Sequence, residues 1–333
     1  MNVRGKKIFV GLSGGVDSAV SAALLKRAGA EVTGVFIKGW YPPGMPCTWA
    51  ADRRDAMRVA ARLHIPFRTL DASAEYKKSV IDYLLAEYRA GRTPNPDVMC
   101  NREVKFGAFY RYAREQGADA IATGHYTSGE KDQCYFLWAV PKEVLEATIF
   151  PVGEMDKKDV RALAKRLGLP VAEKRDSQGV CFLGSISVEE FLRSEFGEEP
   201  GRAVDEAGNA VGEHDGVLLH TLGERVSLQD ASEPGPWFVL AKDVGRNELT
   251  VGKTRTPFSE SAERVIRFAQ ENWFDEPSLV TAAQYRYRGP HIPGHLEHDR
   301  FVSSVPFPEI PTPGQSVVFY DDDELVGGGI ITA

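Results

Sequence analysis

The chain has 333 residues, of which 43% are hydrophobic and 26% are charged, and its formal net charge is −7. This length suggests two or three domains, and this composition is typical of a soluble globular protein. The acidic balance argues against binding of nucleic acid through total charge, although a local basic patch would suffice. No apolar run approaches the ~20 residues that span a bilayer, and no signal-like segment precedes the first predicted strand. We therefore expect a cytoplasmic protein that does not bind membranes.

A glycine-rich turn follows the first predicted strand. Apolar residues 7–10 predict a buried strand, and apolar residues 19–25 predict a helix. Between them, Gly14 and Gly15 allow a tight backbone turn where a side chain would clash. The turn consists of Gly11, Leu12, Ser13, Gly14, Gly15, Val16, Asp17 and Ser18.

This turn has the chemistry of an anion site. Ser13, Ser18 and the helix N-terminus supply hydrogen-bond donors and a partial positive charge. No Lys follows the glycines, so the turn is not the GxxxxGK[ST] loop of phosphoryl-transfer enzymes. A negatively charged residue within an anion site needs an explanation, and Asp17 has one if a Mg²⁺ ion bridges its carboxylate to a pyrophosphate group. An ordinary glycine turn between a strand and a helix is the alternative.

Strands and helices alternate through the first half of the chain. This alternation predicts an α/β fold with a doubly wound parallel sheet, in which ligands bind at the carboxyl ends of the strands. The glycine turn lies at such an end. The further predicted strands are 31–37, 65–70 and 120–123, and the further predicted helices are 52–63, 73–89 and 155–167.

Four cysteines are too few and too scattered for a disulfide scaffold, and none has CxxC spacing for zinc: Cys47, Cys100, Cys134 and Cys181. Pro94 and Pro96 predict an extended loop that puts Cys100 at or near a helix N-terminus, where the dipole favours a thiolate. Arg102 and Lys105 are close enough in sequence to help. A lone cysteine is usually a small buried hydrophobe, but this rigid polar loop favours a reactive thiol.

Two further segments carry candidate chemistry. Gly124 follows the fourth strand, where it permits close approach of a nucleotide, and His125 can donate a hydrogen bond to it or to a substrate. Cys181 lies in a glycine-flanked loop behind Lys174 and Arg175, which is consistent with a lowered thiol pKa. A buried cysteine among apolar neighbours is the alternative for Cys181.

The character of the sequence changes beyond Phe191 and Leu192, and residues 201–251 are rich in glycine. Short β-like pieces at 217–219, 237–240 and 248–251 predict a small separate module. From about Val265 onward, strand-like runs predict a compact all-β domain closed into a barrel, with its best pieces at 279–287, 294–304, 316–320 and 325–332. Within it, residues 285–288 combine aromatic and basic side chains, as RNA binding would require. A half-exposed strand with cross-strand packing is at least as common an explanation.

The ordered motifs resemble a known family. The turn GLSGGVDS resembles the loop of the PP-loop ATP pyrophosphatases, which split ATP into AMP and pyrophosphate. TPNPDVMCNREVKFG, ATGHY, KRDSQGVCFLG, HTLGERV and YRYRG follow in order. Together they resemble the tRNA-specific 2-thiouridylase family, the MnmA-type tRNA-uridine 2-sulfurtransferases, from Gly11 to Ile331. The resemblance implies a catalytic PP-loop domain over 1–198, a small tRNA-contacting module over 199–258 and a β-barrel over 259–333.

The resemblance implies ATP-dependent 2-thiolation of the wobble uridine in tRNAs for Lys, Glu and Gln, with ATP and Mg²⁺ as cofactors. AMP would be transferred to the uracil O2, which has no leaving group otherwise. A sulfur-relay protein or cysteine desulfurase would load a persulfide onto Cys181. Cys100 would then either resolve the persulfide, forming a disulfide with Cys181, or release hydrosulfide that attacks C2. The sequence does not decide between these routes.

Residue roles also follow from the resemblance. Ile37 and Gly124 would line the adenosine site, and Asn95, Pro96 and Asp97 would contact the target base, with Asp97 a candidate general base. The turn from Gly11 to Ser18 would bind the phosphates of ATP, and Asp17 would bind the Mg²⁺ ion. The residues that would contact tRNA are His125, Lys131, Asp132, Gln133, Arg286, Tyr287 and Gln315.

The chain departs from the family pattern in three places. The segment 127–130 is short, Val226–Ser227 stands where Lys-Gly is expected, and the C-terminal domain is short. These changes affect the expected tRNA affinity more than the catalytic cycle. Cys47 and Cys134 have no implied role and are expected to be structural.

Two other functions are considered. The first is a PP-loop ligase or amidotransferase that adenylates a small molecule, which would not need Cys100 and Cys181. The second is an RNA- or nucleotide-binding module with a decayed site. Five intact residues argue against decay: Gly14, Gly15, Asp17, Cys100 and Cys181.

Overall fold

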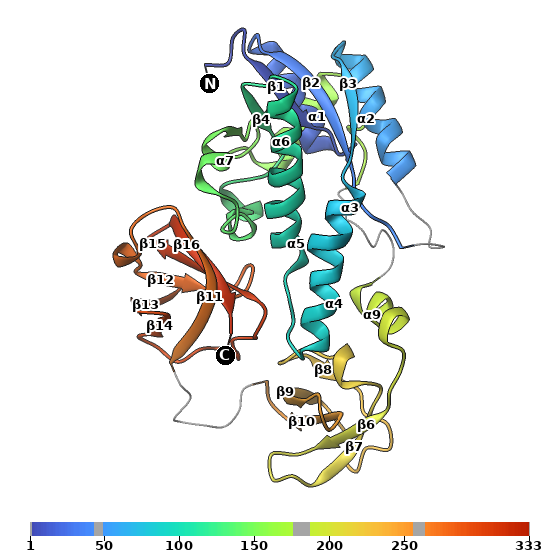
Figure 1. Ribbon diagram of the computed structural model, residues 1–333, viewed down its shortest axis with the longest axis vertical. Helices are drawn as coiled ribbons and strands as arrows, with labels where there is room; N and C mark the ends of the chain where they lie inside the picture. Colours follow the sequence, from blue (N-terminus) through green and yellow to red (C-terminus); the bar gives the residue numbers. More distant parts are fainter. Residues whose placement is uncertain (1, 43–48, 176–186, 256–263, 333) are drawn as a thin grey trace. The chain divides into compact units, whose positions relative to one another are not determined.

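The computed structural model describes residues 2–42, 49–175, 187–255 and 264–332 (Figure 1). Cys47 and Cys181 therefore lie outside the described residues. By their contacts, the residues form two compact units. The first unit comprises 1–81 and 96–185, and the second comprises 82–95 and 186–333.

The first unit is built on a parallel sheet. Its strands run in the order β3-β2-β1-β4-β5, and every pairing is parallel. The predicted parallel sheet is thus confirmed, with β1 at its centre. The strands are β1 (Lys7–Gly11), β2 (Glu31–Lys38), β3 (Phe67–Asp71), β4 (Ala120–Ala122) and β5 (Thr148–Ile149). The helices of this unit are α1 (Val16–Arg27), α2 (Trp49–Leu63), α3 (Ser73–Tyr76), η1 (Lys77–Ile81), α5 (Pro96–Met99), η2 (Cys100–Ala108), α6 (Phe109–Glu115), η3 (Gly129–Lys131), η4 (Cys134–Phe136), α7 (Lys142–Glu146) and α8 (Lys157–Arg166).

Helices cover both faces of this sheet because its strands are apolar on both sides. Side chains alternate along a strand, so Ile8 and Val10 of β1 point to one face and Phe9 to the other. The first face packs against α1, α2 and α8, and the second against η2, α6 and α7. Figure 1 shows α6 and α1 on opposite sides of the sheet. This is the doubly wound arrangement that the alternating sequence predicts.

Two predicted helices differ in detail from the structure. The predicted helix 73–89 is present, but it is divided into α3, the π-helical η1 and α4 (Asp82–Arg89), and α4 belongs to the second unit. The helix of Cys100 begins earlier than predicted, at Pro96. Proline fits the first helical position because no intrahelical partner is lost there.

The second unit contains a small sheet and a helix before it. The helix α9 (Val188–Phe196) starts at a capping box, in which Ser187 accepts from the Glu190 amide and Glu190 accepts from the Ser187 amide. The sheet runs β7-β6-β10-β9-β8. The predicted strand at 217–219 is wrong: Val217–Leu219 forms the 3₁₀ helix η5, because three apolar residues are too few to show a period. The strands are β6 (Gly201–Val204), β7 (Ala210–His214), β8 (Arg225–Val226), β9 (Trp237–Asp243) and β10 (Glu248–Gly252).

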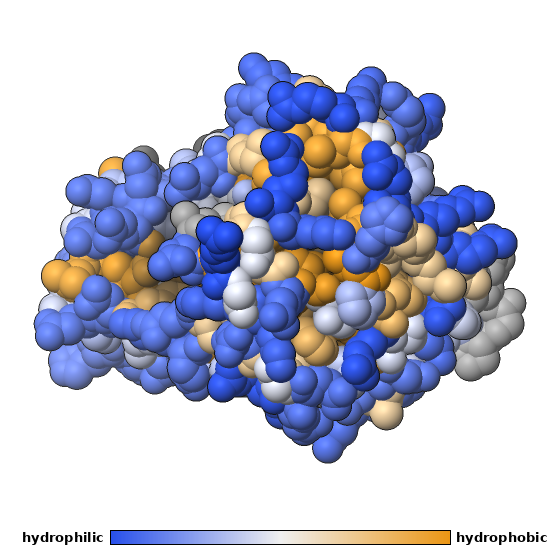
Figure 2. Space-filling view, turned by 90° about the horizontal axis from the view of Figure 1, so that it is seen from above, coloured by the Kyte–Doolittle hydropathy of each residue, from blue (hydrophilic) through white to orange (hydrophobic). Residues whose placement is uncertain are grey.

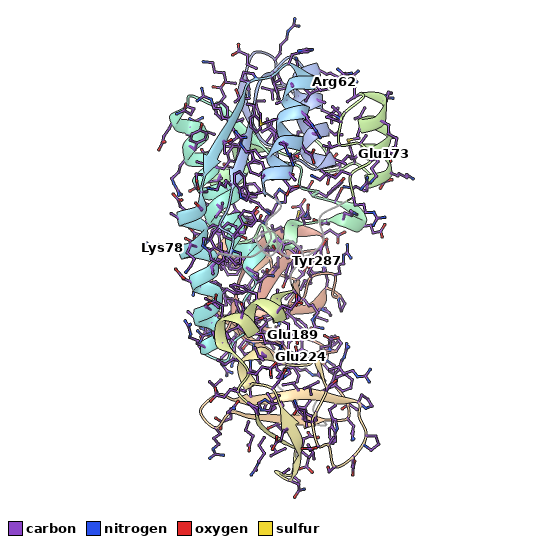
Figure 3. All side chains as sticks on the ribbon, turned by 90° about the vertical axis from the view of Figure 1, so that its right-hand side faces the viewer. Arg62, Lys78, Glu173, Glu189, Glu224 and Tyr287 are labelled. Carbon is purple, nitrogen blue, oxygen red and sulfur yellow. The ribbon has the colours of Figure 1, made fainter. Side chains whose placement is uncertain are left out.

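A network of ion pairs ties α9 to this sheet. Arg193 of α9 pairs with Glu189 (2.9 Å) and with Asp215, and His220 bonds both Asp215 (2.8 Å) and Glu224 (2.5 Å). Glu189 and Glu224, which are labelled in Figure 3, are two of the carboxylates of this network. Burial disfavours the charged imidazole, but the two carboxylates outweigh it and raise the pKa of His220.

The predicted C-terminal barrel is confirmed. Its strands close in the order β11-β14-β13-β12-β15-β16 (orange to red in Figure 1). The predicted run 294–304 is two strands of a hairpin, and the predicted run 279–287 contains a strand of only three residues. The elements are β11 (Val265–Trp273), η6 (Pro277–Leu279), β12 (Ala282–Gln284), β13 (Ile292–Glu297), β14 (Arg300–Ser303), β15 (Ser316–Asp321) and β16 (Glu324–Ile331).

A hollow of about 420 Å³ lies where β1, β2 and β3 begin, lined by residues such as Phe9, Ile65 and Arg68. Figure 2 looks onto this end and shows apolar residues gathered in the middle, with hydrophilic residues around them. The hollow is at the amino ends of the strands, opposite to the edge where parallel sheets bind ligands, so we do not assign the active site to it. Within the described part of the chain, no helix is both long enough and apolar enough to cross a bilayer.

Candidate active site

The glycine loop after β1 requires glycine at position 14. Gly14 has a φ of +79°, a left-handed conformation that L residues rarely adopt. A Cβ at this position would lie 2.3 Å from the backbone oxygen of Asp52 in α2. The loop is therefore pressed against the first turns of α2, and both its conformation and its surroundings select glycine.

Hydrogen bonds of two serines fix the same loop. The Ser18 hydroxyl accepts from the Ser13 amide (3.2 Å) and lies within bonding distance of the Gly15 carbonyl (3.2 Å), to which it donates. The Ser13 hydroxyl accepts from the Gly15 amide (3.3 Å). These serines shape the loop in addition to being candidate donors to an anion. α1 then begins at Val16, so the loop ends at a helix N-terminus that favours negative charge.

Asp17, in the first turn of α1, has two partners in the first unit. Lys157 Nζ lies 2.6 Å and 2.7 Å from its two carboxylate oxygens. The Tyr126 hydroxyl donates to Asp17 Oδ1 over 2.7 Å, and the Tyr126 side chain is buried. The sequence reasoning named Asp17 but missed Lys157, whose only signal is the basic first turn of an amphipathic helix.

Gly124 lies directly behind the loop. A Cβ on Gly124 would be 2.7 Å from the Ser18 nitrogen and 3.0 Å from the Asp17 Cβ. Glycine at this position is therefore required by the close approach of β4's end to α1, whatever the nucleotide needs. Ile37 of β2 is half-buried on the α6 side of the sheet, and its Cδ1 would lie 4.0 Å from a Cβ on Gly11.

His125 is held between aromatic rings. Its ring centroid lies 5.3 Å from that of Phe106 and 6.4 Å from that of Phe150, and its Nδ1 is 2.8 Å from Thr123 Oγ1. Removal from water, with a smaller contribution from the Lys105 charge, lowers the pKa of His125 to about 3. The imidazole is therefore neutral at physiological pH and can exchange hydrogen bonds but not carry a charge.

The helix from Pro96 carries Asp97 and Cys100. Burial raises the pKa of Asp97, and the nearby charge of Lys105 partly offsets this shift. A carboxylate with a raised pKa is better matched to proton abstraction than one with an ordinary pKa. The predicted contribution of Arg102 to a thiolate is weakened, because its guanidinium Nε pairs with Glu103 (2.7 Å).

Cys100 is buried, with 3% of its surface exposed, and it opens the π-helical η2. It lies one turn after the helix start at Pro96, so the helix dipole acts on it less than at the predicted N-terminal position. π-Helical turns are uncommon and often occur at functional sites. The other described cysteine, Cys134, is half-buried, and burial raises its pKa, which makes its thiol unreactive.

The structure thus joins several predicted residues at one edge of the first sheet. β1 and β4 are neighbours, so the loop and the Gly124–His125 segment leave the sheet side by side. His125 contacts Phe106, which is on the same helical stretch as Cys100 and Asp97. Cys181 lies outside the described residues, so its position relative to Cys100 stays a prediction.

Several predicted tRNA contacts instead make bonds within the protein. Asp132 Oδ1 accepts from the Cys134 amide (2.7 Å), and Gln133 Oε1 accepts from the Tyr126 amide (3.1 Å). Arg286 pairs with Glu309. These bonds shape their loops and leave the tRNA contacts of these residues as predictions. Lys131 and Tyr287 are half-exposed.

The aromatic and basic segment 285–288 is not a stripe along one strand. β12 ends at Gln284, and Tyr285 is buried in the barrel core with its hydroxyl donating to the Glu309 carbonyl (3.0 Å). Tyr287 is half-exposed, and the guanidinium carbon of Arg288 lies 5.2 Å from its ring centroid. The expectation of an RNA-binding aromatic run is wrong for Tyr285.

Gln315 holds the loop that precedes Pro96. Its Nε2 donates to the carbonyls of Thr93 (2.8 Å) and Pro94 (3.2 Å), and the Thr93 amide donates to the Pro313 carbonyl (2.9 Å). Gly314 has a φ of +91°, and a Cβ there would lie 2.9 Å from the Thr93 carbonyl. Within the second unit, the barrel thus fixes the backbone just before Asn95, a function that the sequence pattern did not indicate.

Comparisons with known proteins give consistent matches along the chain. Family models match residues 6–185 (tRNA methyl transferase HUP domain), 189–253 (tRNA methyl transferase PRC-barrel domain) and 263–331 (aminomethyltransferase beta-barrel domain). The tRNA-specific 2-thiouridylases MnmA of Streptococcus sanguinis (strain SK36) and Streptococcus pyogenes serotype M1 are each 41% identical to the chain. Each alignment covers 98% of this chain and 95% of the relative. A 4-thiouridine synthetase solved with RNA and ATP is 20% identical, covers 55% of this chain and 46% of its own, and has a TM-score of 0.37, which carries no argument.

Proposed function

The chain belongs to the family of tRNA-specific 2-thiouridylases, and we propose that it catalyses ATP-dependent transfer of sulfur to C2 of the wobble uridine in tRNAs for Lys, Glu and Gln. One observation of the structure carries the proposal. A rigid glycine loop suited to a phosphate chain and a helix with a buried cysteine and a carboxyl of raised pKa meet at one edge of a parallel sheet. Methyl transfer, which the names of two matching models mention, would need neither the loop nor the thiol.

In the first step, the uracil O2 attacks the α-phosphorus of ATP. A bond forms between O2 and phosphorus, and the bond to the bridging oxygen breaks, so that pyrophosphate leaves with the electron pair. The N3 proton of the uracil is lost in this step, and Asp97 is the proposed base. Pyrophosphate is held by the loop from Gly11 to Ser18, whose helix N-terminus favours an anion.

Mg²⁺ would be held by Asp17 together with the phosphates of ATP. Magnesium in ATP-dependent enzymes usually takes one or two carboxylates plus substrate oxygens, and it would neutralise phosphate charge there. The described residues fit this mode: Asp17 is a carboxylate beside the loop, and among them no group of three or more acidic, His or Cys side chains could form an all-protein cage.

In the second step, the terminal sulfur of a persulfide on Cys181 attacks C2, and AMP leaves with the electron pair. The Cys100 thiolate then attacks the Cys181 sulfur, forming a disulfide and leaving the second sulfur on C2. In the alternative route, Cys100 performs the same attack first, and the released hydrosulfide attacks C2. Both routes take sulfur from a sulfur-relay protein or cysteine desulfurase and need a thiol reductant to reopen the disulfide.

We propose that the tRNA is bound by the parts of the chain outside the sulfur chemistry. The proposed domain limits are 1–198, 199–258 and 259–333, with tRNA contacts in all three. Lys131 and Tyr287 keep half-exposed side chains that are suited to phosphate contact and base stacking. The target uridine is already in a loop, so its displacement into the site costs little. The reaction would take place in the cytoplasm.

The test is a reconstituted reaction. The protein is incubated with unmodified tRNA, ATP, Mg²⁺, and a cysteine desulfurase with cysteine as persulfide donor, and 2-thiouridine and pyrophosphate are measured by mass spectrometry. We expect product with the unaltered chain and none with Cys181→Ser or Cys100→Ser, while pyrophosphate release persists in both. Cys134→Ser is the matched control and should retain full product, because its thiol bonds the Thr127 carbonyl and burial raises its pKa.

Three results would contradict the proposal in different ways. Product from Cys181→Ser would remove the persulfide role. Pyrophosphate release that does not depend on tRNA would favour a ligase acting on a small molecule. Nucleotide or RNA binding with neither product would indicate a binding module.

A further inference from the structure

Thr93 is fixed by two different parts of the second unit. It begins the segment that leads to Asn95, and 8% of its surface is exposed. Its hydroxyl donates to the Thr221 hydroxyl (3.3 Å), which lies between η5 and β8 of the small sheet. Its amide donates to the Pro313 carbonyl (2.9 Å), and its carbonyl accepts from Gln315 Nε2 (2.8 Å), just before β15 of the barrel. The side chain of Thr93 is therefore bound by one module and its backbone by the other.

The turn that carries Thr221 is itself fixed. The Glu224 amide donates to the Thr221 carbonyl (3.2 Å), which closes the turn. His220, the preceding residue, bonds the Glu224 carboxylate through Nδ1 (2.5 Å), and its carbonyl accepts from Lys242 Nζ of β9 (2.6 Å). The Thr221 hydroxyl is therefore presented by a turn that is bonded to the small sheet. This turn begins the motif HTLGERV, which the proposed sulfur chemistry does not use.

The segment after Thr93 has little conformational freedom of its own. Pro94 and Pro96 each fix their own φ at roughly −65°. Thr93 and Asn95 each precede a proline, which restricts both to extended conformations. Because few torsions are free between Thr93 and Asn95, a displacement of Thr93 also displaces Asn95.

We propose that Thr93 is a positioning residue for recognition of the target base, and that the small sheet takes part in this recognition through Thr221. Thr221 fixes the Thr93 side chain, Gln315 fixes its backbone, and the prolines carry this placement to Asn95. Neither threonine needs to touch the tRNA for this role. The inference rests on the proposed function in taking Asn95 as a contact to the target uridine.

The first experiment measures the single-turnover rate of 2-thiouridine formation and, separately, the affinity for unmodified tRNA. Thr93→Val keeps the shape of the side chain but removes the hydroxyl, so the rate should fall about 2- to 10-fold, as expected for loss of one neutral hydrogen bond. The affinities for tRNA and ATP should not change, because a misplaced base slows the reaction without removing the contacts that bind either substrate.

Two variants serve as controls for this measurement. Thr93→Ser keeps the hydroxyl and should restore most of the rate. Thr250→Val alters a threonine of β10 whose hydroxyl has no hydrogen-bond partner among the described residues, and its rate should equal that of the unaltered chain. A hydrogen bond that only stabilises the unit would lower the free energy of unfolding and leave the rate unchanged. An unchanged rate in folded Thr93→Val, or an equal loss in Thr93→Ser, would overturn the proposal.

A double-mutant cycle tests whether Thr93 and Thr221 act through one bond. Thr221→Val should slow the reaction as much as Thr93→Val does, and the double variant should be no slower than either one, because both changes remove the same hydrogen bond. Losses that multiply would overturn the proposal. If Thr93→Val fails to fold, an unchanged rate in Thr221→Val would have the same consequence.

Hydrogen exchange gives a measurement that does not depend on thiolation. Mass spectrometry of the peptide 93–99 should show several-fold faster exchange in Thr93→Val and Thr221→Val, and unchanged exchange in Thr250→Val. Faster exchange without thiolation by the unaltered chain would refute the proposed function and leave the placement of Asn95 by the two threonines supported. Thiolation by the unaltered chain together with unchanged exchange in both variants would refute the positioning role alone.

Discussion

Replacing Gly14 by alanine tests whether the loop is held by its contact with α2. Two costs are expected. The first is conformational, because alanine at a φ of +79° costs about 1–2 kcal/mol. The second is steric, because the new Cβ would lie 2.3 Å from the Asp52 backbone oxygen, far inside ordinary contact. Backbone cannot yield as a flexible side chain can, and overpacking of this kind costs about 1–3 kcal/mol more.

Gly117 provides the matched control. It has nearly the same conformation, with a φ of +78°, and a Cβ there would have no atom within 4 Å. Gly117→Ala therefore carries the conformational cost without the steric one. Both substitutions change the unfolded chain equally, so the difference between them isolates the clash with α2.

The assay compares urea unfolding of the two variants and their ATP affinity. We expect Gly14→Ala to lose about 2–5 kcal/mol of unfolding free energy and Gly117→Ala about 1–2 kcal/mol. ATP binding should weaken only in Gly14→Ala, because the loop or the start of α2 must shift. Equal destabilisation of the two variants, or unchanged ATP affinity in Gly14→Ala, would refute the reasoning.

Three further predictions concern other parts of the molecule. Gln315→Ala should lower 2-thiouridine formation several-fold while ATP binding is unchanged, since it frees two carbonyls of the loop before Asn95; an equal loss of ATP binding would contradict this. The pKa of His220 is raised in the folded protein, so its contribution to stability is complete below its ordinary value of 6.5 and is lost as pH rises through the higher folded value. Urea unfolding of His220→Asn at a series of pH values should therefore show its largest deficit at low pH, and a constant deficit would count against the ion-pair network. Because burial raises the pKa of Asp97, thiolation should fall on the acid side at a higher pH than an ordinary carboxyl gives. Asp97→Asn should slow it about 10²- to 10⁴-fold, and Lys105→Met should move the acid limb to still higher pH; an unmoved limb would exclude Asp97 as the base.

The fold of the first unit could be predicted because its signals are local. An apolar run in β1, two glycines and an apolar helix are adjacent in sequence, and each alternation of strand and helix adds to the same sheet. Short elements are harder to predict from the sequence. Residues 217–219 are as apolar as a strand, but Gly216 before them has a φ of +146° and directs the chain into a 3₁₀ turn.

The side-chain partners of the site could not be predicted, because they depend on packing between distant segments. Lys157 and Asp17 are 140 residues apart, and Gln315 and Thr93 are 222 apart. An amphipathic pattern shows that α8 has a buried face, but it does not show that this face meets the start of α1. Similarly, the residue type of Gln315 suits a tRNA contact as well as an internal bond, and the sequence does not show the internal bonds that the structure contains.

The charges near the candidate site explain how an acidic chain could bind a polyanion. The formal net charge is −7, yet Asp17 is paired with Lys157, and Asp52 and Asp55 share Lys174. Electrostatic repulsion of a phosphate chain depends on nearby charges, since more distant ones are screened within about 8 Å at physiological salt. Local pairing therefore governs nucleotide binding at the loop, and the acidic surface elsewhere has little influence on it.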